Sequence, residues 1–104
     1  MKNNILIVED DEFLGSLIIR KLTAEGFSVS YARDGEDALK KIQTEKPDLV
    51  LLDEILPGIH GFEVLSQIRN DPAIASLPVI MLTNMGQREE VDKGIALGAN
   101  DYLI

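Results

Sequence analysis

The sequence predicts an α/β protein with a parallel sheet, and three observations support this class. Uninterrupted apolar runs occur at residues 5–8, 49–52 and 79–82, as is typical of strands buried on both faces. Segments with helical spacing of apolar residues separate them, and each run stops at polar residues. Strands that alternate with helices imply parallel strands joined by right-handed crossovers, with helices on both faces of the sheet.

The first strand is followed by an amphipathic helix and then by a half-exposed strand. Leu14, Ile18 and Leu22 recur at helical spacing, and Gly26 is the predicted stop signal. Residues 27–31 alternate between apolar and polar side chains. Such alternation indicates a strand at an edge of the sheet.

A second helix is predicted between this edge strand and the run at 49–52. Asp34 is the expected N-cap, Ala38, Leu39 and Ile42 form the buried stripe, and Pro47 closes the segment. Beyond residues 49–52, a tight loop is indicated by Pro57, Gly58 and Gly61.

The C-terminal half continues the alternation. Phe62, Leu65 and Ile68 share one face of a third helix, which should break at Asp71-Pro72. After the strand at 79–82, a fourth helix is predicted over residues 87–97, with Gly98 as its stop signal, and a fifth strand over residues 101–104.

Composition narrows the class of protein. A chain of 104 residues has the size of one domain, and the absence of cysteine excludes a disulfide framework and cysteine-ligated zinc, as suits a reducing compartment. We expect no membrane span, because no apolar run approaches about 18 residues. The opening residues lead directly into a strand and do not resemble a signal peptide. A net charge of −8 argues against nucleic-acid binding.

The polar residues at the strand ends form the candidate site. Glu9 and Asp10 follow the first strand, Asp53 follows the third, and Thr83 follows the fourth. Because parallel strands end at one edge of a sheet, where open α/β sheets bind ligands, we expect these residues to converge. Taken alone, Asp53 could merely cap its strand or loop.

Other polar residues nearby have simpler explanations. Asp11 and Glu12 suit the N-terminus of a helix, where acidic side chains are favoured by the helix dipole. Glu54 is expected to be solvated in the loop, and His60 to lie on the surface. We assign no chemistry to Asp11 and Glu12.

Three converging carboxylates repel one another, and a divalent cation removes that conflict. All-oxygen ligands with few carboxylates suit Mg²⁺, which keeps several waters. Together with a threonine hydroxyl, this set suggests phosphoryl chemistry, in which Asp53 could itself be the nucleophile.

Several segments, in their order and spacing, resemble the receiver domain of two-component response regulators. The similar segments are Ile5-Leu6-Ile7-Val8-Glu9-Asp10-Asp11, Pro47 to Asp53 with Leu56-Pro57-Gly58 and Gly61, Leu77 to Thr83, and Gly98-Ala99-Asn100-Asp101-Tyr102. The resemblance covers the whole chain. It implies a flavodoxin-like, doubly wound five-stranded parallel sheet in the order 2-1-3-4-5.

The resemblance also implies a function and a set of roles. Asp53 would accept a phosphoryl group from the phosphohistidine of a sensor histidine kinase or phosphotransfer protein, in the cytoplasm. The domain would be a signalling phosphoacceptor and not a general enzyme. Mg²⁺ would be held by Glu9, Asp10, Asp53 and the backbone carbonyl of Ile55, while Thr83 and Tyr102 would occupy the two switch positions.

The chain departs from the family pattern in three respects. The family has a lysine and a last helix after the fifth strand, whereas this sequence ends at Ile104. Asn84 replaces a small residue, and Glu54 adds a charge beside the acceptor. We therefore expect residues 1–104 to be a C-terminally incomplete receiver domain, with impaired switching. The face left open by the missing helix should favour a homodimer or else a marginally stable monomer.

Two other functions are compatible with parts of the pattern. The departures favour a receiver-like protein-interaction module that works without phosphorylation. A Mg²⁺-dependent phosphatase or topoisomerase-type enzyme would need an Asp-x-Asp pair at a strand end, which Asp53-Glu54-Ile55 does not supply.

Overall fold

The computed structural model describes residues 3–82 and 88–103, without the side chains of residues 88–90, 102 and 103. Strands and helices alternate along the chain. The strands are β1 (Asn4–Val8), β2 (Ser28–Ala32), β3 (Leu49–Asp53), β4 (Val79–Leu82) and β5 (Asp101–Leu103). The helices are α1 (Glu12–Ala24), α2 (Gly35–Glu45), α3 (Gly61–Asn70) and α4 (Arg88–Ala96).

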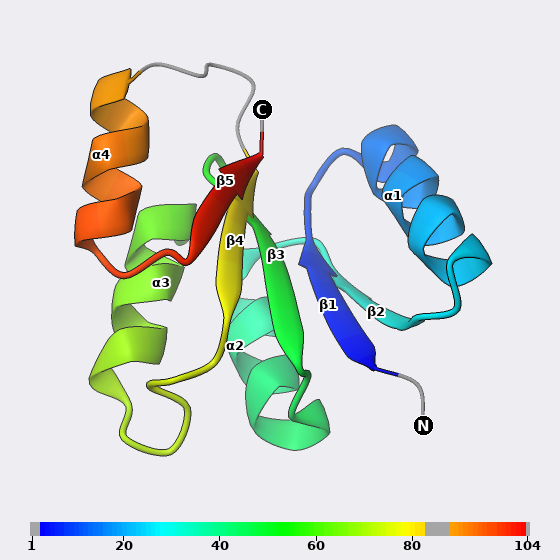
Figure 1. The fold of residues 1–104 in the computed structure, drawn as a ribbon, viewed down its shortest axis with the longest axis horizontal. Coiled ribbons are helices and arrows are strands. Elements are labelled where there is room, and N and C mark those ends of the chain that lie inside the picture. The colour runs from blue at the N-terminus through cyan, green and yellow to red at the C-terminus, as the bar shows by residue number, and fades with distance from the viewer. Residues whose placement is uncertain (1–2, 83–87, 104) are drawn as a thin grey trace.

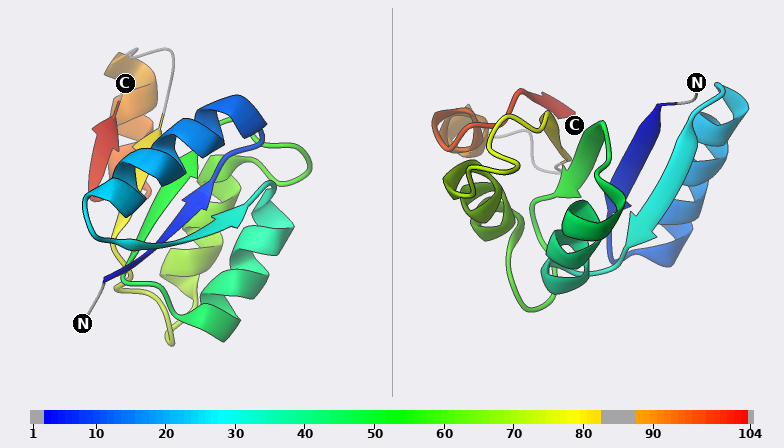
Figure 2. Two further views of the ribbon diagram at one scale, coloured as in Figure 1. Left: turned by 90° about the vertical axis from the view of Figure 1, so that its right-hand side faces the viewer. Right: turned by 90° about the horizontal axis from the view of Figure 1, so that it is seen from below.

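The strands form one parallel sheet in the order β2-β1-β3-β4-β5. Among the described helices, α1 lies on one side of this sheet and α2, α3 and α4 lie on the other (Figures 1 and 2). The predicted α/β class with a parallel sheet is confirmed. None of the described helices is long and apolar enough to cross a membrane.

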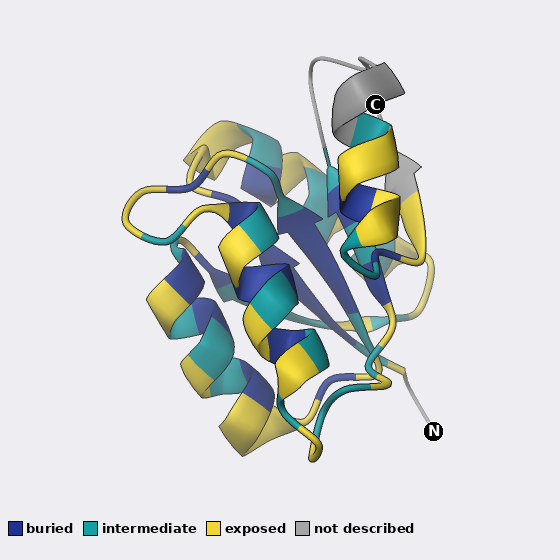
Figure 3. Cartoon of the chain, turned by 90° about the vertical axis from the view of Figure 1, so that its left-hand side faces the viewer, coloured by how far each residue is buried: buried dark blue, intermediate teal, exposed yellow. Residues whose placement is uncertain are grey.

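The buried strands divide their side chains between two apolar clusters, as a period of two requires. Even-numbered residues of β1 and β3 face α2 and α3, and odd-numbered residues face α1. Figure 3 shows the buried strands behind helices whose outer sides are exposed. The larger cluster includes Leu6, Val8, Val50, Leu52, Ile42, Leu65, Ile68 and Met81.

The face that carries α1 is less fully covered. Ile18 and Leu22 are half-buried against the smaller cluster, as are Ile80 and Leu82 of β4. In contrast, the Phe13 and Leu17 side chains of α1 are 75% and 45% exposed. Helix α1 therefore presents apolar surface to solvent along one side.

Local signals in the sequence set most element ends. Asp34 caps α2 by accepting a hydrogen bond from the Asp37 N–H (2.8 Å), as predicted. Gly26 and Gly98 adopt positive φ angles of 96° and 107° after their helices, as suits glycine stop signals. Helix α3 ends at Asn70, before Asp71-Pro72.

Strand β2 differs by one residue from the alternating segment predicted at 27–31. It lies at an edge of the sheet, as expected, but spans Ser28–Ala32. The pairing with β1 sets these bounds, because Asn4 lies opposite Ser28 and Val8 lies opposite Ala32. Alternation of side chains cannot locate a strand end that is fixed by its partner.

Candidate metal centre

Three carboxylates from the ends of two neighbouring strands meet at one edge of the sheet. One oxygen each of Glu9, Asp10 and Asp53 lie within 4.8 Å of one another. Val8 pairs with Leu52, so the residues that follow β1 lie beside the last residue of β3. The structure thus brings together the three acidic residues singled out by sequence.

The three carboxylates differ in their access to solvent. Glu9 is buried, with 3% of its surface exposed, whereas Asp53 is half-buried and Asp10 is exposed. A buried carboxylate among other acids is costly to ionise. The site is therefore open on one side, toward Asp10, and closed around Glu9.

Burial raises the pKa of Glu9 to about 8, and a hydrogen bond to Asp53 acts in the same direction. The negative charges of Asp53 and Asp10 raise this pKa further, while the Asp11 N–H lowers it. Near neutral pH, without a counter-charge, Glu9 therefore keeps its proton. This cluster suits a cation, which would favour the ionised form.

The backbone from Glu9 to Asp11 is fixed by hydrogen bonds on several sides. The Glu9 N–H donates to the Ala32 carbonyl (3.0 Å), and the Tyr31 hydroxyl donates to the Glu9 carbonyl (2.6 Å). The Asp11 N–H donates to Glu9 Oε2 (3.3 Å). The Asp11 side chain in turn caps α1 by accepting a hydrogen bond from the Phe13 N–H. Asp11 has the N-terminal role in α1 predicted from its position.

The Asp53 side is shaped by a loop that returns closely onto β3. The Ile55 N–H donates to Asp53 Oδ1 (3.4 Å), and the Gly61 N–H donates to the Glu54 carbonyl (3.0 Å). A Cβ atom on Gly61 would lie 2.2 Å from the Asp53 carbonyl oxygen. A side chain at position 61 would therefore collide with the backbone of the residue that carries the acceptor carboxylate.

The prediction that Glu54 is solvated in the loop is wrong, whereas the prediction that His60 lies on the surface is confirmed. Glu54 is half-buried, and its Oε2 atom is shielded from solvent. The loop returns closely at this point, since a Cβ on Gly61 would also lie 2.9 Å from the Glu54 Cα. His60 is exposed and precedes α3 without a capping side-chain bond.

The structure describes the other predicted site residues, Ile55, Thr83 and Tyr102, only in part or not at all. The Ile55 side chain is 65% exposed beside Asp53. Thr83 and Asn84 lie outside the described residues, and Tyr102 is described only by its backbone in β5. The roles predicted for Thr83, Tyr102 and the Ile55 carbonyl therefore remain predictions.

The alternation at residues 27–31 predicts only an edge strand and does not indicate that Tyr31 contacts the acidic site. A signal was available in Gly15, a glycine in the middle of a helix, where it is unfavourable unless a neighbour needs the space. In the structure that space is occupied by the Tyr31 ring.

The fold and the carboxylate cluster define the class of protein. It is a parallel α/β domain with an acidic, cation-compatible site at the carboxyl ends of its central strands. The model of the response regulator receiver domain family matches residues 5–104. The chain belongs to this family, as the resemblance implied.

Relatives and solved structures agree with this assignment. The chain is 45% identical to the alkaline phosphatase synthesis transcriptional regulatory protein PhoP of Bacillus subtilis, over 99% of this chain and 42% of that protein. It is 41% identical to the phosphate regulon transcriptional regulatory protein PhoB of Rhizobium meliloti, over 100% of this chain and 46% of that protein. The chain thus spans less than half the length of these curated relatives.

Two crystal structures show the similarity of the folds. A putative response regulator from Chloroflexus aurantiacus has a TM-score of 0.95 and 36% identity, over 99% of this chain and 84% of that one. The BeF3-activated N-terminal receiver domain of Klebsiella pneumoniae RstA has a TM-score of 0.90 and 35% identity, over 97% and 84%.

Proposed function

We propose that this receiver domain is a phosphoacceptor in a two-component system, with Asp53 as the acceptor and Mg²⁺ as the metal. The observation that carries the proposal is the convergence of Glu9, Asp10 and Asp53 within 4.8 Å. A histidine kinase or phosphotransfer protein is the proposed donor, and the cytoplasm the proposed location. The proposal concerns this domain and not the whole of a longer regulator.

The carboxylates would hold Mg²⁺ together with the Ile55 carbonyl. Bound there, the ion would offset negative charge on the transferring phosphoryl group. Asp10 is exposed and open to an arriving ion, while Glu9 would release its proton as it becomes a ligand. An all-oxygen set with few carboxylates fits Mg²⁺.

In the proposed reaction an Asp53 carboxylate oxygen attacks the phosphorus of a phosphohistidine. The P–N bond breaks, the electron pair returns to the imidazole nitrogen, and an acyl phosphate forms on Asp53. Asp53 is half-buried and therefore accessible on one side, and the N–H of Ile55 orients its Oδ1 atom. Thr83 and Tyr102 are proposed to respond to the new charge, as in the family.

Mass spectrometry after incubation with acetyl phosphate and Mg²⁺ tests the acceptor. Any phosphoryl group that the wild-type chain gains should be absent from Asp53→Asn, while Asp71→Asn, a matched change in the α3–β4 loop, should behave like the wild type. A phosphoryl adduct that persists in Asp53→Asn would move the chemistry to another residue.

Mg²⁺ binding, measured beside phosphorylation, distinguishes the phosphoacceptor from the alternative, a protein-interaction module that works without phosphorylation. Calorimetric titration should show that Mg²⁺ binds the wild-type chain and that Asp10→Ala abolishes binding. Ions that bind only the folded state must also raise the midpoint of thermal unfolding. Intact Mg²⁺ binding without any adduct, from acetyl phosphate or a phosphorylated kinase, would favour a module that works without phosphorylation.

A further inference from the structure

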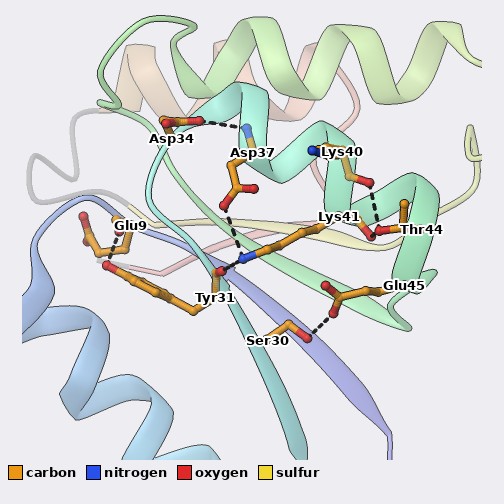
Figure 4. A network of polar contacts seen from close by, with 9 residues as sticks. All are labelled: Glu9, Ser30, Tyr31, Asp34, Asp37, Lys40, Lys41, Thr44 and Glu45. Atoms are coloured by element: carbon orange, nitrogen blue, oxygen red, sulfur yellow. Dashed lines mark hydrogen bonds and ion pairs between the residues drawn. The ribbon is translucent and has the colours of Figure 1, made fainter.

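The hydroxyl group of Tyr31 reaches from the edge strand to the backbone of the acidic site. It donates a hydrogen bond to the Glu9 carbonyl oxygen at 2.6 Å (Figure 4). That length is at the short end of the range for O–H···O bonds. The contact links the ends of β1 and β2 next to the carboxylate cluster.

The accepting carbonyl belongs to the peptide unit that joins Glu9 to Asp10. The orientation of this unit determines the directions in which the two carboxylates leave the backbone. The N–H of Glu9 is already fixed by the Ala32 carbonyl at 3.0 Å. The Tyr31 hydroxyl fixes the other side of the residue, so that the Glu9–Asp10 peptide is held against rotation.

Tyr31 is itself held by two helices on opposite faces of the sheet. On the α1 side, a Cβ atom on Gly15 would lie 2.8 Å from ring atom Cε1 and 3.1 Å from the hydroxyl oxygen of Tyr31. On the α2 side, Lys41 Nζ donates to the Tyr31 carbonyl and pairs with Asp37 at 3.2 Å (Figure 4). The ring can take this position because residue 15 lacks a side chain.

We propose that Tyr31 is a positioning residue for the acidic site: it holds the Glu9–Asp10 peptide so that both carboxylates face Asp53. Tyr31 acts through the Glu9 carbonyl and does not contact the ion or the phosphoryl group. This inference rests on the proposed function, because its purpose is a preorganised cation site. A group held in place before binding loses less freedom when the ion arrives.

Tyr31→Phe tests the inference, because it removes the hydroxyl and keeps the ring above Gly15. We expect the dissociation constant for Mg²⁺ to rise about three- to tenfold, the range expected from loss of one orienting hydrogen bond. The Mg²⁺ concentration for half-maximal phosphorylation should rise by the same factor. The maximal rate at saturating Mg²⁺ should remain, since Tyr31 does not touch the reacting atoms.

Ser30→Ala is the matched control on the same strand. It also removes a hydroxyl hydrogen bond, but one directed to Glu45 of α2 and away from the cluster (Figure 4). We expect its Mg²⁺ affinity to equal that of the wild type. A purely structural Tyr31 would lower the thermal midpoint of the ion-free protein and leave the Mg²⁺ dissociation constant unchanged.

Gly15→Ala provides a second route that retains the hydroxyl. The added methyl group should displace the Tyr31 ring and weaken Mg²⁺ binding in the wild-type background, with no further effect in Tyr31→Phe. If Tyr31→Phe folds poorly, Gly15→Ala alone still tests the inference, and an unchanged Mg²⁺ affinity in Gly15→Ala would overturn it. Simple additivity of the two changes in affinity would contradict the proposed coupling.

The outcomes separate this inference from the proposed function. If the wild-type chain binds Mg²⁺ and Tyr31→Phe binds it equally well, the inference is overturned and the proposed function stands. If the wild-type chain binds no Mg²⁺, the proposed function fails and the inference fails with it.

Discussion

The Arg69 guanidinium donates from Nη2 to the Asn100 side-chain oxygen at 2.9 Å, which joins α3 to the start of β5. The same Asn100 oxygen accepts the N–H of Val79, also at 2.9 Å, at the start of β4. Arg69 further donates to the carbonyls of Gly98 (2.9 Å), Ala75 (3.2 Å) and Leu77 (2.6 Å). One side chain thus connects the loops that precede β4 and β5.

Arg69→Ala should lower the free energy of unfolding by about 2–4 kcal/mol, because several carbonyl and amide oxygens lose their donor. Arg69→Lys should recover only part of this, since one ammonium group cannot reproduce the planar guanidinium contacts. Urea denaturation measures both. The exposed Arg20→Ala is the control and should stay within about 0.5 kcal/mol of the wild type; an equal loss there would contradict the assignment to Arg69.

The raised pKa of Glu9 predicts how stability depends on pH in the absence of Mg²⁺. Between the ordinary value of 4.5 and about 8, the unfolded chain has lost this proton and the folded protein keeps it. The folded state binds more protons in this window, so the Glu9 contribution to stability is present below pH 4.5 and is lost as pH rises toward 8.

Urea denaturation across this pH window, with a chelator present, measures how steeply the free energy of unfolding falls with pH. In Glu9→Gln the side chain at position 9 cannot ionise, so the free energy of unfolding should depend less on pH. For the wild type, apparent Mg²⁺ affinity should increase with pH, since the ion must displace the Glu9 proton. The same slope in both proteins would show that Glu9 is not the titrating group.

Gly61→Ala should disturb both the fold and the acidic site. Its Cβ would lie 2.2 Å from the Asp53 carbonyl oxygen, so the backbone of β3 or of the loop must move. We expect a loss of about 1–3 kcal/mol in stability, together with weaker Mg²⁺ binding.

Gly26→Ala is the control for Gly61→Ala, because it introduces backbone strain without a steric collision. Gly26 has a φ of 96°, but its Cβ would meet nothing within 4 Å. It should cost about 1–2 kcal/mol from backbone strain and leave Mg²⁺ affinity intact. Unchanged Mg²⁺ affinity in Gly61→Ala would show that the close approach does not position Asp53.

The exposed apolar side of α1 predicts self-association at micromolar concentration or, failing that, a marginally stable monomer. Phe13 and Leu17 lie one turn apart and are 75% and 45% exposed, and contiguous exposed apolar surface favours interaction. Sedimentation velocity should show a dimer that Phe13→Ser combined with Leu17→Ser dissociates. Ile95→Ser, at a position 47% exposed on α4, is the control; a stable wild-type monomer that binds no hydrophobic dye would contradict the prediction.

The sequence by itself determined the order of strands and helices and the residues of the acidic cluster. Buried apolar runs at β1, β3 and β4 are recognisable because both faces of each strand must be apolar. Once these strands are parallel, their polar endings must share an edge, and Glu9, Asp10 and Asp53 are expected to converge there. The shared edge follows from strand direction alone, whereas the close approach of the three carboxylates also needs β1 beside β3.

Only the tertiary structure decided what holds that cluster in place. The contact from Tyr31 to Glu9 joins residues 22 apart, and it depends on the pairing of β1 with β2 and on the space left by Gly15. The half-buried position of Glu54 and the close return of Gly61 to β3 are likewise tertiary features. Such contacts follow from the packing of distant segments, which hydrophobic periodicity does not encode.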